Sequence, residues 1–382
     1  QESTPVNKER LLGVAKTALR GKGAENAIDL FSNIIVEALS ILSENRDSVS
    51  SEHVTMFKSG LNSIQNSRLL KGVIINRRVL MDNLPNNLIN PKIAVLDSAL
   101  KIRSFTRNVE IKITSTSQLD SFVEAEQEQK ELIANTIINS GTDVVFCSGE
   151  IDREILYLLS NKSILTVGEL DSSEIENIAE ATGANIVDSI LDIRTSDIGR
   201  CGSLNWERRE HTDQIEDVII IENCKNPRIV TIEIGGSGDV YTEEIIRGLH
   251  DSLCASSNAI NENEIILGAG TIHSQMANSV RMASESEPGK ARLAMEAFAR
   301  ALETIPATLV ENSGGEALDR ILELRAASRE NDVPMGVNKE GLVAPTKDVW
   351  HPRSVIENSL ESATETAMSM LRIDQVISSR GD

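Results

Sequence analysis

Helical periodicity occupies both ends of this chain, and strand-forming patterns lie between them. From about Lys8 to Leu42, apolar residues recur at helical spacing, with one break at the glycines on either side of Lys22. Everything after Gly268 also has a helical pattern, punctuated by glycine turns. The palindromic order of helical, mixed, α/β, mixed and helical segments predicts nested domains.

The middle of the chain carries the strand-forming patterns. Before Ser117 these are Gly72–Asn76, Lys92–Leu96 and Glu110–Thr114. An amphipathic helix follows Ser117, and strands and helices then alternate from Val144 to Val187, which is typical of a layered α/β domain. Two further strands, Asp217–Ile221 and Ile229–Ile234, precede a helix near Tyr241. The predicted fold class is therefore α+β and multidomain, with an α/β domain nested in a mixed domain that is nested in a helical one.

Charge and hydrophobicity exclude two classes of partner. The 382 residues include 58 Asp and Glu against 38 Lys and Arg, so the net charge is -20 and most of the surface would repel a phosphate backbone. We therefore expect no nucleic-acid partner. No run of about 18 apolar residues is apparent, and the N-terminus is polar, so we expect no membrane partner and a cytoplasmic location. Because Gln1 rather than Met begins the chain, we expect a processed product or a piece of a longer protein.

The cysteines and histidines do not show the spacing of a metal site. Four cysteines (Cys147, Cys201, Cys224 and Cys254) lack CxxC or CxxH spacing, and the five histidines contain no HxxxH pair. We expect the cysteines to be buried or half-buried thiols. No metal held by protein side chains alone is predicted.

Two glycine turns and two charged residues are candidates for a site. Gly235–Gly238 follow a strand and precede a helix, but they complete no phosphate-binding motif, so a flexible hinge is the better interpretation. Gly268 and Gly270 allow a close backbone approach to a ligand. Asp251 could orient water beside a phosphate, and Lys22 could sense a phosphate as a point charge. Taken alone, these features are better read as a turn, a solvated helix carboxylate and a surface lysine.

Several blocks together resemble one family, the group II chaperonins of archaea and of the eukaryotic cytosol. The blocks are Gly21–Glu25 (GKGAE), Leu70–Ile75 (LKGVII), Glu222–Pro227 (ENCKNP), Glu296–Asn312 (EAFARALETIPATLVEN), Gly336–Asn338 (GVN) and Leu371–Ile377 (LRIDQVI). They occur in the family's order and spacing, and the resemblance runs from about Pro5 to about Ser378.

The resemblance implies three domains of a chaperonin subunit. The apical substrate-binding domain would span 88–234, with a helical lid at about 115–134. The intermediate domain would comprise 18–87 and 235–267. The equatorial domain would comprise 1–17 and 268–382, and it would be shortened, because the family's phosphate-binding loops lie upstream of the position that matches Gln1.

The resemblance also implies roles for the candidate residues. Asp251 matches the family's catalytic aspartate for ATP hydrolysis, and Lys22 matches its nucleotide-sensing lysine. Gly268 and Gly270 match two glycines of a nucleotide-lining GGG turn, in which Ala269 replaces the middle glycine. Gly314 and Asn338 match positions near the adenosine end. The cofactors implied are ATP and Mg²⁺, with their binding in question because the phosphate-binding loops are missing from this sequence.

Two functional hypotheses follow, and they differ in whether the chain hydrolyses ATP. The first is an ATP-driven folding machine that encloses non-native proteins in a ring, with other chaperonin subunits as partners. The retained Asp251 and Lys22 favour it. The second is a passive module of the same fold that binds non-native proteins without hydrolysing ATP, favoured by the missing phosphate loops. A small-molecule enzyme explains neither the matching blocks nor the lack of a clustered catalytic constellation. Whether the chain is an ATPase stays open at this point.

Overall fold

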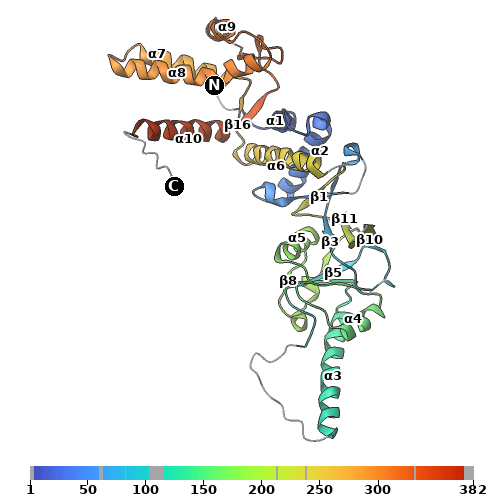
Figure 1. Ribbon diagram of the computed structural model, residues 1–382. Coiled ribbons are helices and arrows are strands. Elements are labelled where there is room, and N and C mark those ends of the chain that lie inside the picture. The colour runs from blue at the N-terminus through green and yellow to red at the C-terminus, as the bar shows by residue number, and fades with distance from the viewer. Residues whose placement is uncertain are drawn as a thin grey trace, which may run out of the picture. The chain divides into compact units, whose positions relative to one another are not determined.

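The computed structural model divides into two compact units (Figure 1). One unit comprises Gln1–Leu39, Ser48–Ser51 and Asp239–Asp382, and the other comprises Ser40–Asp47 and Glu52–Gly238. We call them the terminal unit and the central unit. The residues described are 4–59, 63–81, 83–102, 116–211, 214–236, 239–330 and 333–373. The predicted fold class, a multidomain protein of mixed helix and sheet, is confirmed. The finer division into three domains stays a prediction.

The terminal unit is mainly helical, as the periodicity at the two chain ends predicted. Its helices are α1 (Lys8–Leu19), the first part of α2 (Ile28–Asn45), α6 (Asp239–Glu262), α7 (Thr271–Ser284), α8 (Lys290–Asn312), α9 (Ala317–Glu330) and α10 (Arg353–Leu371). The predicted break near Lys22 is confirmed, because α1 ends at Leu19 and a short 3₁₀ turn, Glu25–Ala27, precedes α2. At the other end of α1, the Asn7 side chain accepts a 2.8 Å hydrogen bond from the backbone N–H of Arg10, which caps the helix.

The expectation that everything after Gly268 is helical is wrong. Three short strands lie there: β14 (Met335–Val337) and β15 (Val343–Pro345) form an antiparallel hairpin, and β16 (Trp350–Pro352) pairs with β13 (Ile265–Leu267). A three-residue strand is too short to show an alternating pattern. Its backbone hydrogen bonds come from partners that local sequence does not reveal.

Among the described residues, one helix is long and apolar enough to be considered as a membrane span. Residues Glu25–Asn45 have the length and apolar composition of a membrane-spanning helix, but the core helix of a soluble protein can have the same length and composition. Phe31, Ile35 and Leu39 on this segment are fully buried within the protein. The apolar character of α2 is therefore accounted for by core packing.

The central unit contains three sheets. Its strands are β1 (Val54–Lys58), β2 (Arg68–Leu70), β3 (Val73–Asn76), β4 (Asn87–Ile89), β5 (Lys92–Leu96), β6 (Val144–Cys147), β7 (Leu165–Val167), β8 (Ile186–Val187), β9 (Gly199–Arg200), β10 (Ser203–His211), β11 (Gln214–Glu222) and β12 (Val230–Ile234). The sheets have the strand orders β1-β12-β2, β3-β11-β10-β4 and β7-β6-β5-β8, with β9 pairing β5. The predicted strand at Glu110–Thr114 lies outside the described residues.

The sheet of β5 to β8 confirms the predicted layered α/β arrangement. Strands β6, β7 and β8 run parallel to their neighbours, and helices α4 (Arg153–Ser160) and α5 (Ser172–Thr182) alternate with them along the chain. Ile93 and Val95 on β5 pack in one core cluster with Ile175 of α5, whereas Leu96 packs in another with Ile155 of α4. Burial of both faces explains why these strands read as continuous apolar runs.

Helix α3 (Thr116–Ser140) confirms the amphipathic helix expected after Ser117. Its C-terminal part packs on the sheet through Ala134 and Ile137, while its N-terminal part projects away from the sheet of this unit (Figure 1). Most of the lid expected at about 115–134 lies in α3, whereas Ala134 packs on the sheet and residue 115 lies outside the described residues. Its role as a lid stays a prediction.

The four cysteines are free thiols, as expected from their spacing. Cys147, Cys201 and Cys224 are buried, and Cys254 is half-buried. Burial in apolar surroundings disfavours the thiolate and raises the pKa of each of the three buried thiols to about 12. These three cysteines are therefore structural residues rather than nucleophiles.

Candidate functional site: a glycine-turn pocket in the terminal unit

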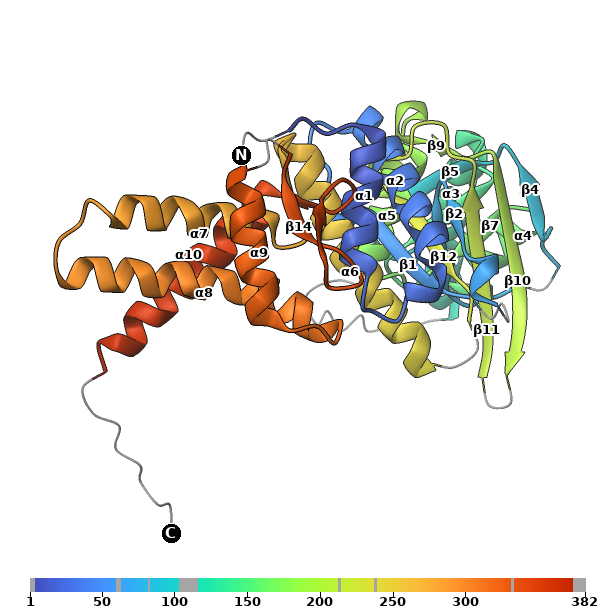
Figure 2. The same cartoon turned by 90° about the horizontal axis from the view of Figure 1, so that it is seen from above.

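A pocket of about 610 Å³ opens beside the glycine turn that joins β13 to α7. We call it the glycine-turn pocket. It is lined by Thr17, Arg20, Gly268, Ala269, Gly270, His273, Ile305, Leu309, Val337, Asn338, Lys339, Ala344, Pro345, Thr346, Lys347, Asp348, Val349 and His351. Segments distant in sequence meet here because β16 pairs with β13 and because α8 packs along α7, as Figure 2 shows for the two helices. The structure thus brings together three predicted site residues, Gly268, Gly270 and Asn338.

The two glycines are required by close packing of the turn. A Cβ atom at Gly268 would lie 2.6 Å from ring atoms of His351, and one at Gly270 would lie 2.6 Å from the Cβ atom of Pro306. Gly270 also has a φ of +75°, in the left-handed region that glycine adopts without strain. The sequence argument that these glycines permit a close backbone approach therefore has a structural basis.

Asn338 shapes the hairpin that forms one wall of the pocket. Its side-chain oxygen accepts hydrogen bonds from the backbone N–H groups of Glu340, at 3.1 Å, and Leu342, at 2.8 Å. Its own backbone N–H donates to the carbonyl oxygen of Leu342 at 2.9 Å. These bonds fix the turn between β14 and β15, and they hold Lys339 at the pocket wall.

The charged residues of the pocket lining favour an anionic ligand. Arg20, Lys339 and Lys347 contribute positive charge, and Asp348 contributes one carboxylate. Guanidinium and ammonium groups form charge-assisted hydrogen bonds to phosphate oxygens. With the close-packed glycine backbone, this composition fits a phosphate-bearing ligand of nucleotide size.

Two histidines in the lining were missed by sequence reasoning, which considered histidines only as metal ligands. His273 follows Gly270 by one turn of α7, and its Nδ1 atom is buried without a hydrogen-bond partner among the residues described. Burial lowers the pKa of His273, and burial together with the neighbouring His273 ring lowers the pKa of His351. The spacing from Gly270 could have indicated His273. His351 lies at the pocket only because β16 pairs with β13.

The other two charged candidates form an ion pair. The Nζ atom of Lys22, in the turn after α1, lies 2.5 Å from Oδ2 of Asp251 on α6. Lys22 follows pocket residue Arg20 by two positions, and its stem packs over Gly248 of α6. Both side chains keep access to solvent, 30% for Lys22 and 49% for Asp251. The structure therefore brings together a lysine and an aspartate that the sequence analysis singled out separately.

Gly314 lies outside the glycine-turn pocket. It occupies the turn after α8, has a φ of +80°, and donates its backbone N–H to the carbonyl oxygen of Glu311 at 2.9 Å. The geometry accounts for a glycine there as a turn residue. No group of three or more His, Cys, Asp or Glu side chains that could hold a metal occurs within the described ranges.

The fold and the pocket define a protein of two compact units, a mostly helical one with an anion-compatible pocket and an α/β-containing one. Comparison with known proteins identifies the class. Residues 1–380 match the TCP-1/cpn60 chaperonin family, so the chain belongs to that family. The expected resemblance to its group II branch is confirmed by the relatives described next.

Relatives of known class cover nearly the whole chain. A thermosome subunit beta from Archaeoglobus fulgidus is 34% identical over 386 residues, covering 99% of this chain and 70% of the relative. A thermosome subunit from Methanocaldococcus jannaschii is 35% identical over 382 residues, with the same two coverages. Among solved structures, the open-state monomer of a group II chaperonin from Methanococcoides burtonii matches with a TM-score of 0.64 at 24% identity, covering 97% of this chain and 88% of that one. This structural match supports the fold.

Proposed function

We propose that this chain is a chaperonin subunit that binds non-native proteins and assists their folding in a process linked to ATP. The observation that carries the proposal is the 34% identity to a thermosome subunit over 99% of the chain. Its partners would be unfolded proteins and other chaperonin subunits, and its location the cytoplasm. The projecting part of α3 would serve as the lid.

The glycine-turn pocket would hold the nucleotide. The backbone of Gly268 and Gly270 allows the close approach that a phosphate chain needs. Arg20, Lys339 and Lys347 would offset the phosphate charge, and Asn338 would lie toward the adenosine end, whereas Gly314 is not part of the pocket lining. ATP would supply the phosphoryl group together with Mg²⁺, and Asp348 is the carboxylate of the pocket lining that would contact the ion.

Asp251 would be the residue that acts on water. A carboxylate can orient a water molecule and accept its proton as the water approaches a phosphoryl group. Lys22, with its Nζ atom 2.5 Å from Oδ2, fixes the position of that carboxylate. For Asp251 to contact water beside the phosphate, the ion pair must loosen. A lysine that moves to the ligand's phosphate would provide this change.

The same ion pair supports an alternative function, a binding module that holds non-native proteins without hydrolysing ATP. In the structure, Asp251 is engaged by Lys22 at 2.5 Å. If the pair stays closed, Asp251 is not available to orient water, and only binding of proteins remains.

Steady-state ATP hydrolysis by the purified chain separates the two functions. We expect turnover that Asp251→Ala reduces by about a hundredfold or more, the usual contribution of a positioned base. The control is Asp319→Ala, which removes an exposed carboxylate from α9 and should leave turnover unchanged. In parallel, suppression of aggregation of a chemically denatured protein should be measured with and without ATP. Equal rates of ATP hydrolysis by the native chain and Asp251→Ala would overturn the ATPase proposal. Suppression of aggregation that is the same with and without ATP would support the passive module.

A further inference from the structure

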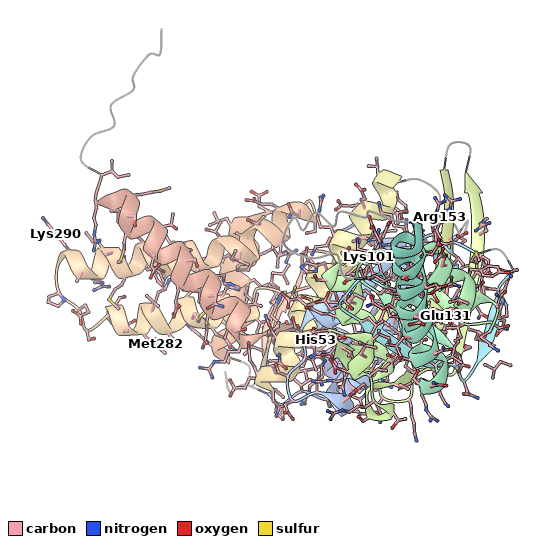
Figure 3. All side chains as sticks on the ribbon, turned by 90° about the horizontal axis from the view of Figure 1, so that it is seen from below. His53, Lys101, Glu131, Arg153, Met282 and Lys290 are labelled. Atoms are coloured by element: carbon pink, nitrogen blue, oxygen red, sulfur yellow. The ribbon has the colours of Figure 1, made fainter. Side chains whose placement is uncertain are left out.

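Five arginines converge on a second pocket of the terminal unit. The pocket has a volume of about 380 Å³ and is lined by residues of three helices, α7, α8 and α9, and of the loop after α7. We call it the arginine pocket, after Arg281, Arg292, Arg300, Arg325 and Arg329. Figure 2 shows α7 and α8 side by side with α9 beside them, and Figure 3 labels Met282 and Lys290 near the loop that joins α7 to α8.

The arginine pocket differs in charge from the chain as a whole. The chain carries a net charge of -20, which repels anions from most of its surface. The carboxylates near these five arginines are Glu285 and Glu296 of the pocket lining and the buried Glu303, which accepts hydrogen bonds from Arg281 and Arg325. Five guanidinium groups against three carboxylates leave an excess of two positive charges.

Glu303 fixes two of the arginines in place. Its carboxylate is 5% exposed and accepts hydrogen bonds from Nη1 of Arg281 at 2.5 Å and from Nε of Arg325 at 2.6 Å. The Nη2 atoms of both arginines donate to its other oxygen. Burial alone would raise the pKa of Glu303, but the hydrogen bonds from Arg325 and Arg281 outweigh it and lower the pKa. Two guanidinium groups from two helices are thus held side by side before any ligand arrives.

The remaining three arginines can adapt to a ligand. Arg292 pairs with Glu296 at 3.0 Å on the exposed surface of α8, a contact that contributes little and is easily exchanged. Arg300 and Arg329 are exposed, and neither forms an ion pair within the part of the chain that the structure describes. Both guanidinium groups can therefore donate charge-assisted hydrogen bonds to a bound anion.

We propose that the arginine pocket binds a compact anion that carries several phosphate groups. Guanidinium groups grip phosphate oxygens with two parallel hydrogen bonds each, so arginines from three helices match an anion with several phosphates better than a single phosphate. The site is separate from the glycine-turn pocket. His273 and Arg281 are eight residues apart on α7, which corresponds to about 12 Å of helix rise.

Titration calorimetry of the full chain with inorganic tripolyphosphate at physiological ionic strength tests the proposal. We expect binding that weakens by about tenfold or more in the double variant Arg300→Ala/Arg329→Ala, because charge-assisted hydrogen bonds are lost. These two arginines are chosen because Arg281 and Arg325 also neutralise the buried Glu303. Sulfate, which carries a single anionic group, should bind more weakly to the native chain.

The matched control is Arg247→Ala/Arg320→Ala, which changes the net charge equally but removes arginines paired with Glu244 on α6 and with Glu323 on α9. This control should bind tripolyphosphate as the native chain does, and thermal unfolding by circular dichroism should show all variants folded. The proposal is overturned if the native chain fails to bind, if both double variants bind equally, or if a polyglutamate peptide binds where tripolyphosphate does not. If tripolyphosphate bound in the glycine-turn pocket instead, both double variants would bind it equally.

Discussion

His273 and His351 link the stability of the protein to pH. Their folded-state pKa values are lowered, so between those values and about 6.5 the unfolded chain binds more protons than the folded one. The contribution of these two histidines to the free energy of unfolding is therefore fully present above about pH 6.5, and stability falls as the pH drops below that value. We expect the double variant His273→Gln/His351→Gln to lose less stability between pH 7.5 and 5.5 than the native chain, as measured by the midpoint of urea unfolding.

An exposed histidine provides the control for this experiment. His250 lies on the exposed surface of α6, and His250→Gln makes the same substitution outside the glycine-turn pocket. The pKa of His53, in the central unit, is also lowered by burial, so the double variant should flatten the dependence only in part. An unchanged slope in the double variant would show that the two histidines are not the groups that titrate.

Residues of the site were anticipated from sequence to different extents. Gly268 and Gly270 were singled out from their glycine turn and Asn338 through a family resemblance, and all three lie on one pocket. Lys22 and Asp251 were singled out separately, and their 2.5 Å contact joins residues 229 positions apart, which no local pattern encodes. His351 and Lys347 were not anticipated, because their surroundings are created by chain segments far away in sequence.

At the level of elements, the approach of α8 to the start of α7 depends on one glycine. Gly270→Ala would place a Cβ 2.6 Å from that of Pro306 in α8 and would force alanine into a left-handed conformation. We expect a loss of about 2 to 4 kcal/mol in the free energy of unfolding, since the conformation costs about 1 to 2 kcal/mol and overpacking adds to it. ATP binding should weaken as well. Urea unfolding measures the first effect and titration calorimetry the second.

Gly183 separates the two contributions. It follows α5 with a φ of +72° and a ψ of +22°, in the same left-handed region as Gly270, and a Cβ there would have nothing within 4 Å. Gly183→Ala should therefore cost only the conformational part, about 1 to 2 kcal/mol. Equal losses for the two variants would mean that the contact with Pro306 is unimportant.

Across the whole molecule, each unit has a core of its own. Val310, Ile321, Leu324 and Val337 form a cluster in the terminal unit, whereas Phe146 belongs to a cluster of the central unit. If ATP binds in the glycine-turn pocket, it should stabilise the terminal unit alone. At a hundredfold excess over its Kd, ligand binding contributes about 2.7 kcal/mol, which shifts a transition of a unit of this size by roughly 5 to 10 °C.

Scanning calorimetry can assign the two transitions. Phe146 is fully buried, and Phe146→Ala should lower the transition of the central unit through the cavity that it leaves. ATP should raise the other transition and leave this one in place. A shift by ATP of the transition that responds to Phe146→Ala would contradict the placement of the nucleotide in the terminal unit.

Local patterns in the sequence determined much of this protein, because they report interactions between near neighbours. The continuous apolar run Val144–Cys147 forms a strand that is buried on both faces, and Asp171 with Glu174 starts α5 by reciprocal hydrogen bonds at its first turn. The family followed from blocks spread over the chain. Only the tertiary structure decided the pairing of β13 with β16, the histidines of the glycine-turn pocket and the arginines that surround Glu303. Those contacts join residues from separate segments, and their energy depends on burial and charge that exist only once the chain has folded.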